Sequence, residues 1–226
     1  MAMKLLLVRH GQTPANVAGR LDTAAPGPGL TALGLDQAAA IPAALAGSPV
    51  DAIFVSTLIR TRLTATPLSV NRGLEMVQLP GIHEIGAATL ENLSDRESIR
   101  TYMQTAFSWG LGDLDVVMPG GHDGHEFFDR FDDSIATVAS ATDGTAVVVS
   151  HGAAMRVWAA GRAKNIPASY AGEHDIHNTG VLEFEGSPED GWTLISWQGH
   201  AIGGGQLDDP TADDPTGETL SEAMDD

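Results

Sequence analysis

Three segments of the chain share one pattern of apolar and polar positions. Each has a short run of apolar, often β-branched residues, then one or two polar residues, then a helix-forming stretch. The segments are LLLVRHGQT from Leu5, DAIFVSTLIRTRLTA from Asp51 and TAVVVSHGAAMRVWAAG from Thr145. Continuous apolar strands that alternate with helices indicate a parallel sheet covered on both faces. The pattern predicts a three-layer α/β/α fold with a mostly parallel central sheet.

The segments between these strands predict further helices and one hairpin. Thr31 is a plausible N-cap for the alanine-rich stretch that follows, which Pro42 should kink or shorten near Ala38. A capping-box pattern at residues 94–97 precedes an apolar helical stripe, and residues 127–138 carry a second stripe. The runs VLEF at 181–184 and TLISW at 193–197 flank the turn residues GSPEDG, which predicts a C-terminal antiparallel hairpin.

Length and charge divide the chain into one domain and a tail. Its 226 residues suit a single domain, which we place at residues 1–202. The last twenty residues hold eight acids and no base, and GGG at 203–205 marks a linker before them. Low hydrophobicity and self-repulsion predict that residues 203–226 form an acidic, disordered tail.

Composition excludes several classes of function. The absence of cysteine excludes disulfides, thiol nucleophiles and thiolate metal sites. The net charge of −18 disfavours nucleic acid and anionic membrane partners. The first apolar run is too short for a signal peptide and no run is long enough to span a bilayer, so we expect a cytoplasmic protein.

Cationic and titratable side chains follow the predicted strands. In open parallel sheets ligands bind at the carboxyl ends of the strands. An arginine fork such as that of Arg9 matches two phosphate oxygens, and a neutral histidine such as His10 can attack phosphorus directly. Gly11 allows close backbone approach to a bound anion. The residues expected together at this edge are Arg9, His10, Ser56, Arg60, Ser150 and His151, and they predict a phosphoryl site.

A metal site is disfavoured by the spacing of the histidines. Of the eight histidines, His122 with His125 and His174 with His177 form His-x-x-His pairs. Neither pair has an evident carboxylate and third ligand at a recognised spacing. We therefore expect no metal and no other cofactor.

Four motifs, in order, resemble those of the histidine phosphatase superfamily, also called phosphoglycerate mutase-like. RHGQT with Asn16 resembles its opening signature, and LTALGLDQA from Leu30 is similar to its LTxxGxxQA element. STLIRTRLTA from Ser56 resembles its third block, and VVVSHG from Val147 its closing signature. The resemblance spans roughly residues 4–200.

The resemblance implies a role for each matching residue. His10 would become phosphorylated, Arg9 and Arg60 would clamp the phosphoryl group, and His151 would donate to its oxygens. Asn16 and the Gly152 amide would complete the pocket. Flanking cations favour neutral His10, the form that attacks.

A leaving alkoxide needs a proton from a carboxylic acid. The family takes this acid from a segment shaped like LxExxxGxxEG, and IHEIGAATLEN fits with Glu84 as the acid and Glu91 as the second glutamate. Ala88 and Asn92 replace glycines, which puts the backbone path of the loop in question. Glu91 as the acid is the alternative.

A second departure from the family pattern lies at PGGHDGHEFFDR. Gly121, Glu126 and Arg130 match the family, but His122 and Asp123 replace its Glu and Ser. Asp123 can still cap the helix. His122 either lines the substrate pocket or lies on the surface.

These observations predict a phosphomonoesterase acting on small phosphorylated metabolites. Only 66 residues separate Glu84 from His151, and the longer insertion that the dependent mutases carry there is missing. A phosphomonoesterase is therefore favoured, and phosphoglycerate mutase is the alternative. A non-catalytic member that binds a phospholigand is the second. Sugar phosphates or phosphoglycerate derivatives are the expected substrates, and Arg20 either meets a second acid group or faces solvent. The hairpin edge leaves a homodimer open.

Overall fold

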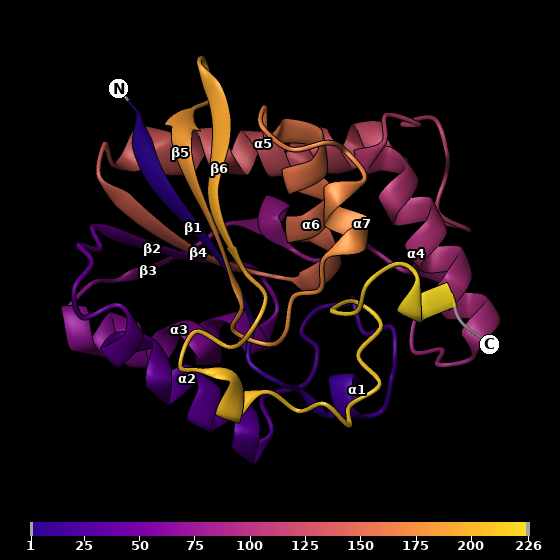
Figure 1. Ribbon diagram of the computed structural model, residues 1–226, viewed down its shortest axis with the longest axis horizontal. Helices are drawn as coiled ribbons and strands as arrows, with labels where there is room; N and C mark the ends of the chain where they lie inside the picture. Colours follow the sequence, from indigo (N-terminus) through magenta and orange to yellow (C-terminus); the bar gives the residue numbers. More distant parts are fainter. Residues whose placement is uncertain (1, 225–226) are drawn as a thin grey trace.

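The computed structural model describes residues 2–224, which form a six-stranded sheet in the order β3-β2-β4-β1-β5-β6 (Figure 1). The strands are β1 (Met3–Arg9), β2 (Ala52–Val55), β3 (Met76–Gln78), β4 (Thr145–Ser150), β5 (Val181–Ser187) and β6 (Gly191–Gln198). Strands β1 to β4 pair in parallel, whereas β5 and β6 form an antiparallel hairpin beside β1. The mostly parallel sheet with a C-terminal hairpin is confirmed.

Helices cover both faces of this sheet, as Figure 1 shows. They are α1 (Pro14–Val17), α2 (Ala32–Ala44), α3 (Ile59–Arg72), α4 (Arg96–Gly110), α5 (Gly124–Ala141), α6 (Gly152–Arg162) and α7 (Tyr170–Glu173). The alternation of side chains along β1 separates two cores: Leu5 and Leu7 pack on the α4, α5 and α6 side, whereas Leu6 and Val8 pack on the α2 and α3 side. The predicted three-layer architecture is confirmed.

Three local details differ from the sequence predictions. Helix α2 starts after its Thr31 cap as expected but continues past Ala38 to Ala44, with Pro42 inside its last turn, where the proline removes one backbone hydrogen bond. The N-cap of α4 is Asp95, whose carboxylate accepts from the Ser98 amide, so the predicted cap lies one residue too early. The short edge strand β3 carried no periodic pattern and was not predicted. Asp123 caps α5 as expected.

The C-terminal segment, residues 203–224, lies along the domain, drawn in yellow in Figure 1. It contains two 3-10 turns, Gly205–Leu207 and Glu222–Met224. The prediction of a disordered tail assumed that its acidic side chains repel one another. In the structure, Asp214 pairs with Arg9, and backbone carbonyls of the segment accept hydrogen bonds from Arg156. In the structure the segment thus contacts the domain, while the predicted disorder of the tail and the boundary at residue 202 stay predictions. Within residues 2–224, no helix combines the length and apolarity needed to cross a membrane.

Candidate active site

Three neighbouring strands bring the predicted catalytic side chains to one edge of the sheet. In the register of the parallel strands, Arg9 at the end of β1 is level with Ser150 at the end of β4, and Val55 at the end of β2 is level with Val149. His10 and His151 follow directly, and their ring centroids are 5.2 Å apart. Residues that are 141 positions apart thus become neighbours because their strands pair in parallel.

His10 is held as a neutral imidazole with one nitrogen available. Its Nδ1 lies 2.8 Å from the carbonyl oxygen of Gly11, so Nδ1 carries the proton and donates it there, which leaves the lone pair on Nε2. Burial lowers the pKa of His10 well below 6.5, and the charges of Arg60 and Arg9 lower it further. A neutral imidazole with a free Nε2 is the nucleophilic form of histidine.

His151 is fully buried beside His10. Its Nε2 lies 2.7 Å from the Ser56 hydroxyl, and its Nδ1 has no hydrogen-bond partner among the described residues. Burial, followed by the charge of Arg60, lowers the pKa of His151 well below its ordinary value. An unpartnered buried polar atom is costly, and in native structures it is explained by strain, by a catalytic role or by a bound water or ion.

Both predicted clamps are buried arginines that now contact acids of this chain. Arg9 binds the Asp214 carboxylate. Arg60 donates to two oxygens of Asp22, the side-chain Oδ1 at 3.4 Å and the backbone carbonyl oxygen at 2.8 Å. The Nε atoms of Arg9 and Arg60 have no partner among residues 2–224. Burial is the main cause that lowers the pKa of Arg60 and raises that of Asp22.

A small cavity, partly open to solvent, lies between these groups. Its volume is about 10 Å³, the space of about one water molecule. The residues that line it are His10, Thr13, Ala15, Asn16, Arg20, Asp22, Arg60, Glu84 and Thr216. The predicted nucleophile His10, the clamp Arg60, Asn16 and the predicted acid Glu84 thus surround one cavity. The cavity itself is too small for a phosphoryl group.

Glu84 is fixed by the first turn of α6 and by its own loop. Its Oε1 accepts from the amides of Ala154 and Ile85, each at 2.8 Å, and its Oε2 lies 3.3 Å from the Ala153 amide. Arg130 of α5 donates to the carbonyl oxygens of His83 and Glu84. Arg130 thereby holds the backbone that carries Glu84, a role that its motif match alone did not indicate.

The alternative acid, Glu91, has a different environment. Its carboxylate accepts from the amides of Thr23 and Ala24 and from the Thr23 hydroxyl, so it organises the loop after α1. Ala88 and Asn92, the two replaced glycines, have φ angles of 51° and 63°. The loop therefore keeps a backbone path that suits glycine and places non-glycine residues on it.

The remaining sequence candidates fall at several places. Asn16 lines the cavity, Arg20 lies at its exposed rim, and His122 lies on the surface beside Glu126. A side chain on Gly152 would collide with the carbonyl oxygen of Thr216. Gly11 is required for another reason than the expected one: a Cβ there would lie 2.7 Å from the Gly34 carbonyl oxygen of α2.

Sequence reasoning missed several residues of the site. Asn178 donates to the carbonyl oxygen of His10 and lies 3.4 Å from Asn16, while Asp22, Thr216 and Asp214 contact the two arginines. The sequence held one indication of Thr216 and Asp214: they lie in an acidic segment, and the predicted pocket is basic. Their placement depends on long-range packing.

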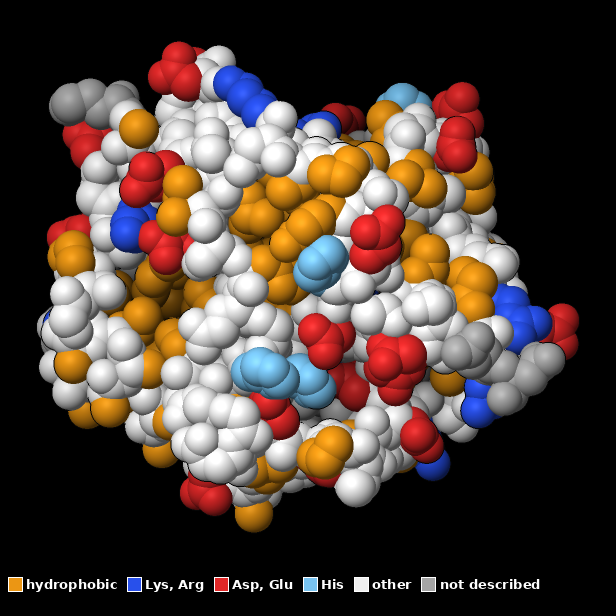
Figure 2. Space-filling model, viewed as in Figure 1, with side chains coloured by type: hydrophobic (Ala, Val, Ile, Leu, Met, Phe, Trp, Pro, Cys, Tyr) orange, Lys and Arg blue, Asp and Glu red, His pale blue; other side chains and the backbone are white. Residues whose placement is uncertain are grey.

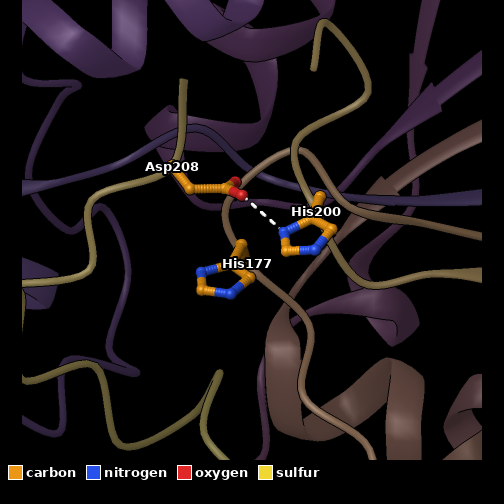
Figure 3. Close-up of side chains that lie close together, drawn as sticks. All are labelled: His177, His200 and Asp208. Carbon is orange, nitrogen blue, oxygen red and sulfur yellow. Dashed lines mark hydrogen bonds and ion pairs between the residues drawn. The ribbon is translucent and has the colours of Figure 1, made fainter. Parts of the chain in front are cut away.

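One histidine of the candidate metal pairs, His177, lies close to a histidine and an aspartate from later in the chain. Figure 3 shows His177, His200 and Asp208, whose ligand atoms lie within 4.8 Å of one another. His200 Nδ1 is hydrogen-bonded to Asp208 at 2.6 Å, and His177 Nε2 lies 3.2 Å from Asp175. Each imidazole is thus paired with one carboxylate, and the expectation that the protein uses no metal stays a prediction.

A larger pocket of about 710 Å³ is lined by the C-terminal segment together with residues of the domain. Figure 2 shows acidic and histidine side chains gathered at the middle of this face. The acids that line the pocket are Asp175, Asp208, Asp209, Asp213, Asp214, Glu218 and Glu222. Such a pocket repels a phosphoester, so size alone does not make it the substrate site.

The family model of the histidine phosphatase superfamily (branch 1) matches residues 5–199. The chain is 40% identical over 222 residues to the PE-PGRS family protein PE_PGRS11 of Mycobacterium tuberculosis, which covers 91% of this chain and 38% of that protein. It is 33% identical over 128 residues to the adenosylcobalamin/alpha-ribazole phosphatase of Salmonella typhimurium, which covers 57% and 62% respectively. The chain thus spans less than two thirds of the length of both relatives.

Solved structures share the fold. The mycobacterial glucosyl-3-phosphoglycerate phosphatase superimposes with a TM-score of 0.73 at 23% identity, over 88% of this chain and 99% of that one. The phosphoserine phosphatase of Entamoeba histolytica in complex with 3-phosphoglyceric acid gives a TM-score of 0.67 at 22% identity, over 88% and 98%. On the match of the family model to most of the chain, together with the shared fold, this protein belongs to branch 1 of the histidine phosphatase superfamily.

Proposed function

We propose that this protein is a phosphomonoesterase that hydrolyses small phosphorylated metabolites through a phosphohistidine on His10. The observation that carries the proposal is the state of His10: a buried neutral imidazole, with Nδ1 bonded to a carbonyl oxygen and Nε2 free, between two buried arginines. Among the relatives are a phosphoserine phosphatase from Hydrogenobacter thermophilus and the alpha-ribazole phosphatases, which supports phosphoester hydrolysis.

The reaction would proceed in two displacements. His10 Nε2 attacks phosphorus while the ester oxygen leaves, and Glu84 as a carboxylic acid gives that oxygen its proton. Water, deprotonated by the Glu84 carboxylate, then attacks the phosphohistidine and releases inorganic phosphate and neutral His10. Arg9, Arg60 and His151 stabilise the charge on the phosphoryl oxygens in both steps.

Substrate choice stays within a class. We infer sugar phosphates or phosphoglycerate derivatives, because the cavity is bordered by short polar side chains and Arg20 rather than by aromatic rings that would stack a base. A relative named as a probable phosphoglycerate mutase, 28% identical over 154 residues, keeps the mutase as the second candidate.

The test is phosphate release from a panel of small phosphomonoesters by the wild-type protein and by His10→Ala, with excess EDTA throughout. We expect release by the wild type and a loss of at least about 10³-fold in His10→Ala, which removes the nucleophile. Equal activity of the two proteins would overturn the proposal. A phosphoglycerate isomerisation without net phosphate release would identify the mutase instead.

A further inference from the structure

The fork of Arg9 is filled by the chain itself. Arg9 Nη1 donates to the Asp214 carboxylate at 2.6 Å and to the carbonyl oxygen of Ile176 at 2.7 Å. Arg9 Nη2 donates to the other Asp214 oxygen at 2.7 Å and to the Thr216 hydroxyl at 3.0 Å. These four bonds use all four terminal N–H groups of the guanidinium, so it has no fork left for a phosphoryl group.

Asp214 also binds Asn16, another of the predicted phosphate ligands. The Oδ1 atom that accepts from Arg9 Nη2 accepts from the Asn16 side-chain amide at 2.9 Å. One carboxylate oxygen therefore gathers donors from both residues that would hold a phosphoryl oxygen. The carboxylate is planar and anionic like one edge of a phosphate, which explains why the same donors accept it.

The surroundings favour this occupied state. The side chain of Arg9 is fully buried and that of Asp214 is 14% exposed, so their attraction is weakly screened. The cavity beside His10 holds only about 10 Å³, and Thr216 of the same segment lies in its wall. The Asp22 contact with Arg60 is looser, since its Oδ1 lies 3.4 Å from Nη1.

The segment is anchored on both sides of residues 210–215. Arg156 of α6 donates to the backbone carbonyls of Thr216 and Glu218, which fixes the chain just after Asp214. Before it, the chain is held at residues 207–209: Gln12 and Gln37 donate to Asp209 and to the carbonyl oxygen of Leu207, and Asp208 pairs with His200. Between these anchors Asp213 is exposed to solvent. A shift of residues 210–215 can withdraw Asp214 while the Arg156 anchor stays in place.

We propose that Asp214 is an internal competitor for the phosphoryl site, and that it must leave Arg9 and Asn16 before a phosphoester can bind. This inference rests on the proposed function, in which Arg9 and Asn16 bind the phosphoryl group. The C-terminal segment then sets the apparent affinity for phosphoesters, because the apparent Kd equals the intrinsic Kd divided by the fraction of molecules in which Asp214 has left the site.

The test is calorimetric binding of inorganic phosphate to the wild type, Asp214→Asn and the control Asp213→Asn. The control removes the same charge from the neighbouring, exposed position. We expect Asp214→Asn to bind phosphate at least about fivefold more tightly, with an equal fall in KM for an aryl phosphate, and the control to stay within about twofold of the wild type. Unchanged or weaker phosphate binding by Asp214→Asn would overturn the proposal.

Hydrogen exchange in the wild type keeps the proposal testable if the variant folds poorly. The amides of Gly217 and Glu218 donate to the carbonyl oxygen of Asp214. Saturating phosphate should speed their exchange, and slower or unchanged exchange would contradict the release of Asp214. The two proposals fail differently: tighter phosphate binding without turnover of any ester would overturn the phosphatase, whereas turnover without tighter binding would overturn the competitor.

Discussion

The chemistry of single residues follows from what surrounds them. His10 and His151 lack solvent and lie near buried arginines, which keeps both imidazoles neutral. The Glu84 carboxylate accepts from three backbone amides at the start of α6 and in its own loop. The sequence placed these residue types at strand ends, and the packing around them decides their protonation and direction.

The neutrality of His10 predicts an activity profile that persists into acid. The pKa of His10 is lowered in the folded protein, so its imidazole stays neutral as pH falls through 6.5. By the same shift, the stability linked to neutral His10 is fully present above about pH 6.5 and is lost as pH falls toward the folded pKa. We expect kcat/KM, corrected for titration of the substrate, to fall less than about twofold from pH 7 to 5.5. A tenfold loss per unit below pH 6.5 would show an unperturbed histidine.

The role of Glu84 is tested by the leaving group. Glu84→Gln should slow hydrolysis of alkyl phosphates by about 10²-fold or more, because a poor leaving group needs the proton. An aryl phosphate with an activated leaving group should be affected much less in its first step. Glu91→Gln is the matched control, and a larger leaving-group dependence in that variant would identify Glu91 as the acid.

At the scale of elements, the loops around the site depend on a few backbone positions. Thr13 caps α1 and Asp123 caps α5, as their side chains and neighbours indicate. The loop at residues 86–92 is less conventional, since Ala88 in the 3-10 turn Ala88–Leu90 has a left-handed conformation. Arg130 and Glu91 hold the two sides of this region in place.

Ala88→Gly should therefore stabilise the fold. Ala88 is exposed, so its methyl group packs little, and glycine removes the cost of a positive φ. We expect a gain of about 0.5–1 kcal/mol in the free energy of unfolding, or about 1–4 °C in Tm. Ala87→Gly, at a buried residue with φ −79°, should destabilise instead. A lower Tm for Ala88→Gly in thermal denaturation would contradict the strain.

At the scale of the whole molecule, the protein has a net charge of −18 but buries a small group of cationic side chains. Arg9, Arg60 and Arg156 are all buried, and the acidic C-terminal segment supplies acceptors to two of them. A segment that composition alone treats as a free tail thus contributes to the packing of the domain. The acids that remain exposed on it line the pocket of about 710 Å³.

Deletion of residues 208–226 should destabilise the protein, because it removes the Asp214 partner of Arg9 and two carbonyl acceptors of Arg156. We expect a loss of at least about 2 kcal/mol in the free energy of unfolding. A truncation after Met224 retains these contacts and serves as the control in urea denaturation. Equal stability of the two truncated proteins would favour the disordered tail that the composition predicts.

The sequence by itself determined the layers of the fold, the strands β1, β2 and β4, and the set of side chains at their ends. These features are local: they follow from apolar periodicity, capping residues and motif spacing, and the parallel register then brings Arg9 and Ser150 level. Only the tertiary structure decided that Asp214, 205 positions from Arg9, fills its guanidinium fork. Such a contact depends on the path of a chain segment without regular structure, and no local pattern encodes that path.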